Sequence, residues 1–122
     1  MRCLMKDSNG NPTWRTIRSP IHYCTHSLGP LLKIMDDRCI SVSSLHTGSK
    51  ICSEFSKMDM EVGIFKTQKG AVVKMLAGFA VCRESAFHYY SIYRTKGCLE
   101  TIRPSSEEGT IAYFEGRWLW YR

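Results

Sequence analysis

The chain has 122 residues, of which 43% are hydrophobic and 23% are charged. These proportions are ordinary for a globular protein rather than a disordered or membrane protein, and the length suits one domain or part of one. The 17 lysine and arginine residues outnumber the 11 aspartate and glutamate residues. Because the basic residues are scattered along the whole chain without a cluster, we expect no nucleic-acid partner.

The sequence shows no targeting or spanning segment. No apolar run approaches the roughly 18 residues that a membrane helix requires, and residues 1–12 do not resemble a secretory signal. We therefore expect a cytoplasmic protein with no membrane partner. The six cysteines include no Cys-x-x-Cys pair, so we expect reduced thiols rather than a zinc site or disulfides. Cys24, Cys39 and Cys82 fall within apolar patterns and are expected in the core.

The first half of the chain predicts a loop and then a helix. Within residues 1–18, a cluster of turn formers at 7–12 predicts an exposed loop, and the segment shows no core pattern of its own. Ser19 and Pro20 are typical of a helix start and predict a helix over 19–36. Pro30 lacks the amide that would bond to the His26 carbonyl, so a kink is expected after the second turn. The apolar residues recur at spacings of three and four: Ile21, Cys24, Leu28, Leu31, Leu32 and Met35.

The rest of the chain predicts short strands. Runs of alternating polar and apolar residues are separated by turn formers, and hairpins are expected at Gly70, Gly97 and Gly116. One helix followed by such strands indicates an α+β fold, a largely antiparallel open sheet with one face covered by helix. The strands are expected over 39–45, 60–64, 72–81, 87–94, 98–102, 110–114 and 117–121.

Candidate chemistry lies on the predicted helix. His22 and His26 are four residues apart and share a face with Gly29 and Lys33, turned away from the apolar stripe. Two imidazoles and an ammonium group beside a Gly-Pro kink suit a polar cleft, because imidazole exchanges protons near neutral pH. The same pattern also fits a solvated helix face. The His-x-x-x-His pair is not assigned to a metal, because the helix supplies no third ligand.

Aromatic residues mark two of the predicted strands. Period-2 alternation places Tyr89, Ser91 and Tyr93 on one face of the strand. Tyr89, Tyr90 and Tyr93 could stack on a sugar or a base, or they could simply be good strand formers. Trp118 and Trp120 alternate on the last strand and suggest a sheet face covered by another group, such as a second subunit. No glycine-rich dinucleotide loop, phosphate loop or Ser-His-Asp arrangement occurs.

Three strings carry a family resemblance: IHYCTHSLGPLL at 21–32, FKTQKGAVV at 65–73 and YSIYRTKGCLE at 90–100. Together, over roughly residues 12–103, they resemble the C-terminal domain of the glucose-fructose oxidoreductase, inositol dehydrogenase and rhizopine catabolism (Gfo/Idh/MocA) family. The resemblance implies an α+β substrate and oligomerisation domain, paired in this family with an N-terminal Rossmann domain that binds NAD or NADP. Many such proteins oxidise or reduce a sugar or cyclitol carbon by hydride transfer.

The resemblance also assigns residues. His26 matches the histidine of the family's Asp-x-x-x-His motif, which acts as general base toward the substrate hydroxyl, whereas His22 stands where the motif has aspartate. We expect His26 to be catalytic and His22 and Lys33 to bind substrate. Arg94 stands where a glycine is usual before Thr-Lys-Gly, and a side chain there is expected to strain the turn.

The chain lacks a Rossmann domain and a Glu-Lys-Pro motif, so residues 1–122 are expected to be a single, partial substrate and oligomerisation domain. We expect no cofactor or metal in this chain, with NAD or NADP implied for a full-length parent. The expected function is that of a truncated substrate-binding domain of an NAD(P)-dependent sugar or cyclitol oxidoreductase, without catalysis on its own. A fragment of an NAD-dependent glycoside hydrolase, or a non-catalytic oligomerisation or sugar-binding module, are the alternatives. The expected partners are a carbohydrate-type molecule and further copies of the chain, bound through the sheet face.

Overall fold

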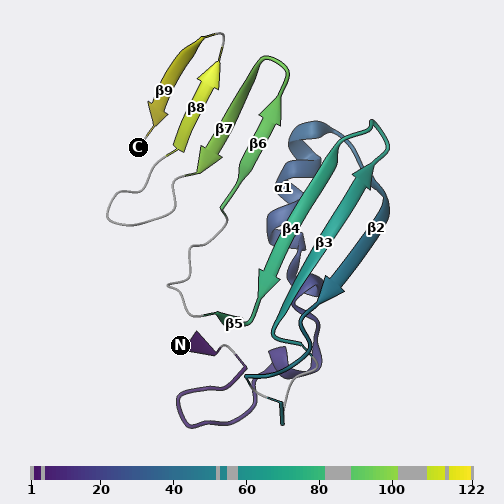
Figure 1. Ribbon diagram of the computed structural model, residues 1–122, viewed down its shortest axis with the longest axis vertical. Coiled ribbons are helices and arrows are strands. Elements are labelled where there is room, and N and C mark those ends of the chain that lie inside the picture. Colours follow the sequence, from purple (N-terminus) through teal and green to yellow (C-terminus); the bar gives the residue numbers. More distant parts are fainter. Residues whose placement is uncertain are drawn as a thin grey trace. The chain divides into compact units, whose positions relative to one another are not determined.

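The computed structural model describes residues 2–3, 5–51, 53–54, 58–81, 89–101, 110–114 and 116–121. The chain divides into two compact units, Met1–Arg83 and Glu84–Arg122. Within the described residues the fold is α+β, and every strand pair is antiparallel (Figure 1). The predicted fold class is therefore confirmed, although the described strands lie in three sheets of two, three and four strands rather than in one.

The two ends of the first unit pair with each other. Strand β1 (Arg2–Cys3) lies antiparallel to β5 (Ala80–Val81). Met5 follows β1, is completely buried, and clusters with Phe79 and Ala80. The expectation that this first segment contributes nothing to a core is therefore wrong, whereas the cluster of turn formers at 7–12 is exposed as predicted. The partners of Met5 come from the far end of the unit, and local sequence gives no sign of them.

The helical region is divided more finely than its pattern predicts. It contains the 3-10 helices η1 (Trp14–Ile17) and η2 (Pro20–Tyr23), followed by the α-helix α1 (Thr25–Met35). The predicted continuous helix over 19–36 is therefore wrong in its first turns, and the break falls at Cys24 rather than at Pro30. Glu61 accepts a hydrogen bond from the Ile21 amide and so ties η2 to the sheet, a contact that helical periodicity does not encode.

The helix α1 ends on a left-handed residue. Asp36 has φ 48° and ψ 52°, and it is the one non-glycine residue with positive φ within the described part of the chain. The Lys69 ammonium group donates to the carbonyl oxygens of Met35 at 3.4 Å and Asp36 at 2.5 Å. A cation thus satisfies carbonyl groups that have no partner within the helix. Arg94 is not among the positive-φ residues, so its side chain does not sit on a left-handed backbone that would favour glycine.

A three-stranded sheet forms the centre of the first unit. Its order is β2 (Cys39–His46), β3 (Met60–Thr67) and β4 (Val72–Gly78). Helix η2 packs on β3 and β4, and α1 runs behind them in Figure 1. The predicted strand over 72–81 is divided into β4 and β5, because the pairing with the β3 side ends at the hydrogen bond from the Phe79 amide to the Asp59 carbonyl oxygen and the chain then pairs with β1. The covered face of β3 is buried at Glu61, Gly63, Phe65 and Thr67.

The second unit contains a four-stranded meander. Its strands are β6 (Ser91–Arg94), β7 (Gly97–Thr101), β8 (Thr110–Phe114) and β9 (Arg117–Tyr121), in chain order. The bounds of β8 and β9 are those predicted, and Gly116 takes the positive φ of 82° that their turn requires. The beginning of the strand predicted over 87–94 lies outside the described residues.

The remaining expectations concern thiols and membranes. Cys24, Cys39 and Cys98 are free and half-buried, whereas Cys82 lies outside the described residues. Burial raises the pKa of the Cys39 thiol. None of the helices in the described part of the chain is long and apolar enough to cross a membrane.

Candidate functional site

Three rings follow one another on the surface of the first unit. The imidazole of His26, in the first turn of α1, has its centroid 4.8 Å from that of Tyr23 in η2. The Tyr23 ring lies 5.7 Å from Trp14 of η1. His26 is exposed, and Trp14 and Tyr23 remain 46% and 42% exposed. We call these three residues the aromatic row.

The row is attached to the protein interior at one end. Trp14 meets the buried Phe79 edge-on, with ring centroids 6.4 Å apart. The Arg15 guanidinium group lies 4.4 Å from the centroid of the Trp14 ring, at a distance typical of a cation–π contact. Aromatic faces can hold the C–H face of a ring-shaped polyol. An imidazole beside them can accept a proton from one of its hydroxyl groups.

The structure separates the residues that the sequence places on one helix face. His22 lies in η2, whereas His26 and Lys33 lie in α1, and all three side chains are exposed. The expected four-residue relationship between the histidines on a continuous α-helix is therefore wrong, because α1 begins only at Thr25. Lys33 does share a face with His26, since seven residues make two helical turns.

A buried carboxylate fixes the segment that carries Tyr23. Glu61 is only 6% exposed, and it accepts hydrogen bonds from the Ser19 hydroxyl, from the Ser44 hydroxyl at 2.7 Å and from the Ile21 amide at 3.2 Å. Burial alone would raise its pKa, but these hydrogen bonds and the neighbouring His46 outweigh burial and lower the pKa. The ionised carboxylate thereby joins η2 to strands β2 and β3.

Gly63 allows η2 to lie close to the sheet. A Cβ atom at this position would collide with the Cδ1 atom of Ile21 and would lie 2.9 Å from the Cε2 atom of Phe65. Glu61 and Gly63 stand two residues apart on the covered face of β3. They therefore position η2, and through it Tyr23, without being part of the aromatic row themselves.

Sequence reasoning missed Trp14, Tyr23, Glu61 and Gly63. An acid among the apolar residues of β3 was the available signal for Glu61, because period-2 alternation places it beside Gly63 and Phe65. Tyr23 could have been found from its position three residues before His26. Trp14 has no such signal, since its contacts with Tyr23 and Phe79 arise only in the folded chain.

A hydrogen-bonded group lies on the sheet of the second unit. The Ser91 hydroxyl is 2.7 Å from the Tyr93 hydroxyl and donates to the Glu100 carboxylate at 2.7 Å, and the Tyr93 hydroxyl donates to the same carboxylate at 2.5 Å. These contacts confirm that Ser91 and Tyr93 share a face. The bond to Glu100 raises the pKa of Tyr93, and the bonds from Tyr93 and Ser91 lower the pKa of Glu100.

No set of three or more histidine, cysteine, aspartate or glutamate side chains able to hold a metal ion occurs within the described ranges. Compared with known proteins, the chain matches no family model and no curated protein.

Proposed function

We propose that this chain is the substrate-binding portion of a Gfo/Idh/MocA-type NAD(P)-dependent oxidoreductase, and that it binds a sugar or cyclitol at the aromatic row. The observation that carries the proposal is the contact between the His26 and Tyr23 rings, 4.8 Å apart on an exposed surface. The α+β fold and the position of His26 at the start of α1 are consistent with the resemblance in residues 21–32.

In this proposal each exposed group has a defined role. The rings of Trp14 and Tyr23 hold the C–H face of the polyol, and the His26 imidazole accepts a proton from one hydroxyl group. Lys33, on the His26 face of α1, and His22, in η2, donate hydrogen bonds to other hydroxyl groups. Glu61 is a positioning residue, because it acts only through η2.

The nicotinamide cofactor of the proposed parent does not fit the residues described. Dinucleotides bind at parallel β–α–β units, whereas every strand pair in the described part of the chain is antiparallel. The role proposed for this chain is therefore polyol binding and proton uptake, without hydride transfer on its own.

A screen of monosaccharides and cyclitols by calorimetry tests the binding role. We expect a dissociation constant near 1 mM for the best polyol, as is reasonable for an open site. His26→Ala and Tyr23→Ala should each weaken binding about tenfold, the loss of roughly 1.4 kcal/mol. Ile34→Ala is the matched control on α1, since Ile34 is 70% exposed. Unchanged binding in His26→Ala would remove this residue from the site.

Adding NAD to the purified chain tests whether the chain binds only the polyol and not the cofactor. We expect no change in melting temperature and no cofactor fluorescence signal. Micromolar binding of NAD would contradict the proposal that this chain supplies only the substrate side.

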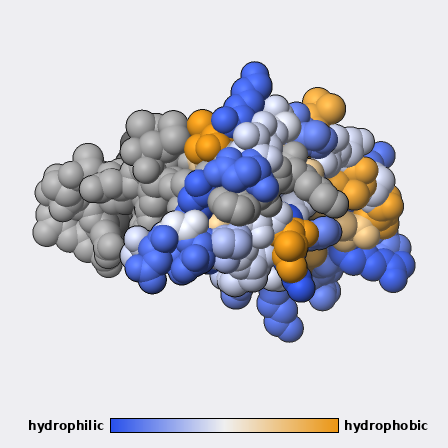
Figure 2. Space-filling view, turned by 90° about the horizontal axis from the view of Figure 1, so that it is seen from below, coloured by the Kyte–Doolittle hydropathy of each residue, from blue (hydrophilic) through white to orange (hydrophobic). Residues whose placement is uncertain are grey.

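A second candidate function, self-association, is favoured by the sheet face opposite η2. On this face the register aligns Leu45, Val62 and Leu76, and it places Ile64 and Val72 further along the face, opposite Lys74 and Lys66. Leu45 is 75% exposed and Leu76 is 66% exposed. Figure 2 shows apolar side chains reaching the surface in several patches among hydrophilic ones. Such a face favours contact with a second copy of the chain.

Light scattering during size-exclusion chromatography tests self-association. We expect a dimer or larger assembly that Leu76→Glu dissociates, while Ile34→Glu, a matched change on exposed α1 surface, leaves it intact. A monomer at high concentration would count against self-association through this face.

A further inference from the structure

The strand β2 forms one edge of the three-stranded sheet in the first unit. It pairs with β3 along one side, and within the described ranges no strand pairs with its other side. In Figure 1, α1 lies behind β4, at the opposite edge of this sheet from β2. Alternate backbone N–H and C=O groups along the free side of β2 can therefore bond to another strand.

The side chains of β2 are exposed on both faces of the sheet. All of its residues but the first are exposed, and they include Ile40 and Val42, each 57% exposed, and Leu45, 75% exposed. The register places Val42 on the face that carries η2, beside Phe65, and Leu45 on the opposite face. Neighbouring elements of the unit thus leave an eight-residue strand open on three sides.

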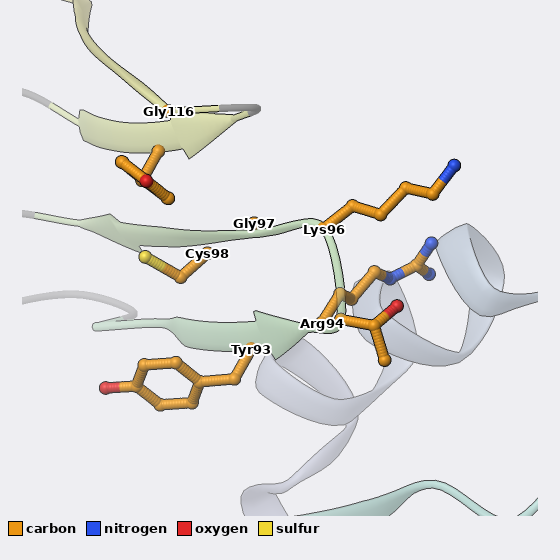
Figure 3. A pocket seen from close by; sticks show the side chains of 8 residues that line it. Tyr93, Arg94, Lys96, Gly97, Cys98 and Gly116 are labelled. Atoms are coloured by element: carbon orange, nitrogen blue, oxygen red, sulfur yellow. The ribbon is translucent and has the colours of Figure 1, made fainter.

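The strand β2 also lacks the charges that usually protect a sheet edge. A charged residue, most often lysine, opposes pairing of an edge strand with another chain. The other edge strands of the two larger sheets each carry one: β4 contains Lys74, β6 contains Arg94 and β9 contains Arg117. Figure 3 shows the Arg94 side chain extending from the end of its strand at the β6–β7 turn. In contrast, β2 contains no Lys, Arg, Asp, Glu or Pro.

We propose that β2 pairs antiparallel with β2 of a second copy of this chain, which joins two three-stranded sheets into one sheet of six strands. An uncharged strand can lie opposite its own copy without bringing like charges together, whereas Lys74 opposes the same pairing by β4. The pairing uses the edge of the sheet rather than the face on which Leu76 lies. It is also independent of the polyol site proposed at the aromatic row.

Pairing of a strand with its own copy fixes the symmetry of the dimer. The two-fold axis stands perpendicular to the sheet, so the helices of both copies lie on the same face. The bulge between Cys39 and Ser41 leaves β2 regularly paired from Ser41 onward. An axis centred on Ser43 therefore pairs Ser41 with Leu45 of the second copy. In this register Val42 is the diagonal neighbour of Val42 of the second copy, a separation that long side chains can span.

Sedimentation velocity of the full chain, measured from about 1 μM to about 200 μM, tests the pairing. We expect a dimer with a dissociation constant of about 10–100 μM, because one strand edge makes a small interface. Hydrogen exchange at both concentrations tests its mode. Alternate amides of residues 41–45 should exchange more slowly at the higher concentration, since pairing gives them carbonyl partners. Contact through the sheet face gives these amides no new hydrogen bonds.

Charge at Val42 separates edge pairing from face contact. Val42→Lys and Val42→Glu should each raise the dissociation constant of the dimer about tenfold, because each places two like charges near the axis. An equimolar mixture of these variants should restore association, since the mixed dimer brings opposite charges together. Val42→Thr remains β-branched and uncharged, and this matched control should dimerise like the wild type. Because Val42 is 57% exposed, all three variants should fold normally.

Three results would overturn the proposal. One is a chain that stays monomeric at the highest concentration, which would also count against contact through the sheet face. Another is a dimer that Leu76→Glu dissociates and Val42→Lys leaves intact, which would assign self-association to the face alone. The third is a dimer in which the amides of residues 41–45 exchange at the same rate at both concentrations. Dissociation by Val42→Lys, with restoration in the mixture and an intact Leu76→Glu dimer, would support pairing at the edge.

Discussion

The Ser19 hydroxyl donates a hydrogen bond to the Glu61 carboxylate, which lies 42 residues further along the chain. This contact holds η2 against the central strand of the first unit. Since the carboxylate is buried, the contact also makes the stability of the unit depend on one ionised group.

Replacing that group should lower stability at neutral pH. We expect Glu61→Gln to reduce the free energy of unfolding by about 1–3 kcal/mol, because partners in a buried hydrogen-bond network lose an ionised acceptor. Urea denaturation at pH 7 measures the effect. Glu54→Gln is the control, since Glu54 is exposed and pairs only with Lys6 in the contacts described. Equal stability of Glu61→Gln and the wild type would contradict the role assigned to Glu61.

The same variant should change how stability depends on pH. The pKa of Glu61 is lower in the folded chain than its ordinary value, so its contribution is complete above the unfolded pKa of about 4.3. The contribution is lost as the pH falls through the folded pKa. Between about pH 5 and pH 3 the wild type should therefore lose stability faster than Glu61→Gln. Thermal melts across this range measure the difference, and parallel curves would contradict it.

Glycine substitutions should differ in effect at two positions. Gly63→Ala should destabilise the chain by about 1–3 kcal/mol, because the added Cβ atom collides with Ile21 and approaches Phe65. Gly29→Ala should change stability by less than about 1 kcal/mol, because the gain from a better helix former is offset by crowding between the new Cβ atom and the ring of Pro30. Thermal denaturation of both variants tests this contrast. A stable Gly63→Ala variant would show that the Ile21 and Phe65 side chains can move aside, and that close packing of η2 does not require glycine at this position.

The end of α1 should prefer glycine. Asp36 has φ 48°, a conformation that costs L-residues roughly 1–2 kcal/mol. Asp36→Gly should therefore be neutral or stabilising, whereas Asp36→Val should destabilise the chain by about 1 kcal/mol or more. Loss of the exposed ion pair between Asp36 and Lys69 should contribute little to either value. If urea denaturation shows that Asp36→Val is more stable than Asp36→Gly, this result would contradict the left-handed conformation of residue 36.

Met5 should contribute to the core despite its place near the start of the chain. Because it is completely buried beside Phe79 and Ala80, Met5→Ala should cost about 2–5 kcal/mol of unfolding free energy. Ile17→Ala is the control, since Ile17 is 77% exposed, and it should cost less than about 0.5 kcal/mol. Similar melting temperatures for the two variants would show that the N-terminal segment does not pack as described.

Local sequence predicted the elements that depend on local interactions. Strands β8 and β9 have their predicted bounds, because alternating residues flank a glycine at the turn. The antiparallel pairing of β3 with β4 was likewise predictable from the turn at Gly70. The fold class follows from such hairpins, since each joins neighbours in the chain.

Elements that depend on distant partners were predicted less well. The strand over 72–81 is divided because residues 80–81, which form β5, pair with β1 rather than with the neighbours of β4. The helix begins late because Glu61 holds η2. In the candidate site, His26 was identified from a resemblance, but its neighbour Trp14 was not, because the 5.7 Å contact with Tyr23 joins separate helices.

The pairing of β1 with β5 joins the residues near the two ends of the first unit. Bringing two strands together that are so far apart in the sequence costs conformational entropy. Because each strand has only two residues, few hydrogen bonds offset that cost. Amide protons there should exchange with solvent before those of β3, and each opening would uncover the methionine and phenylalanine side chains beneath it.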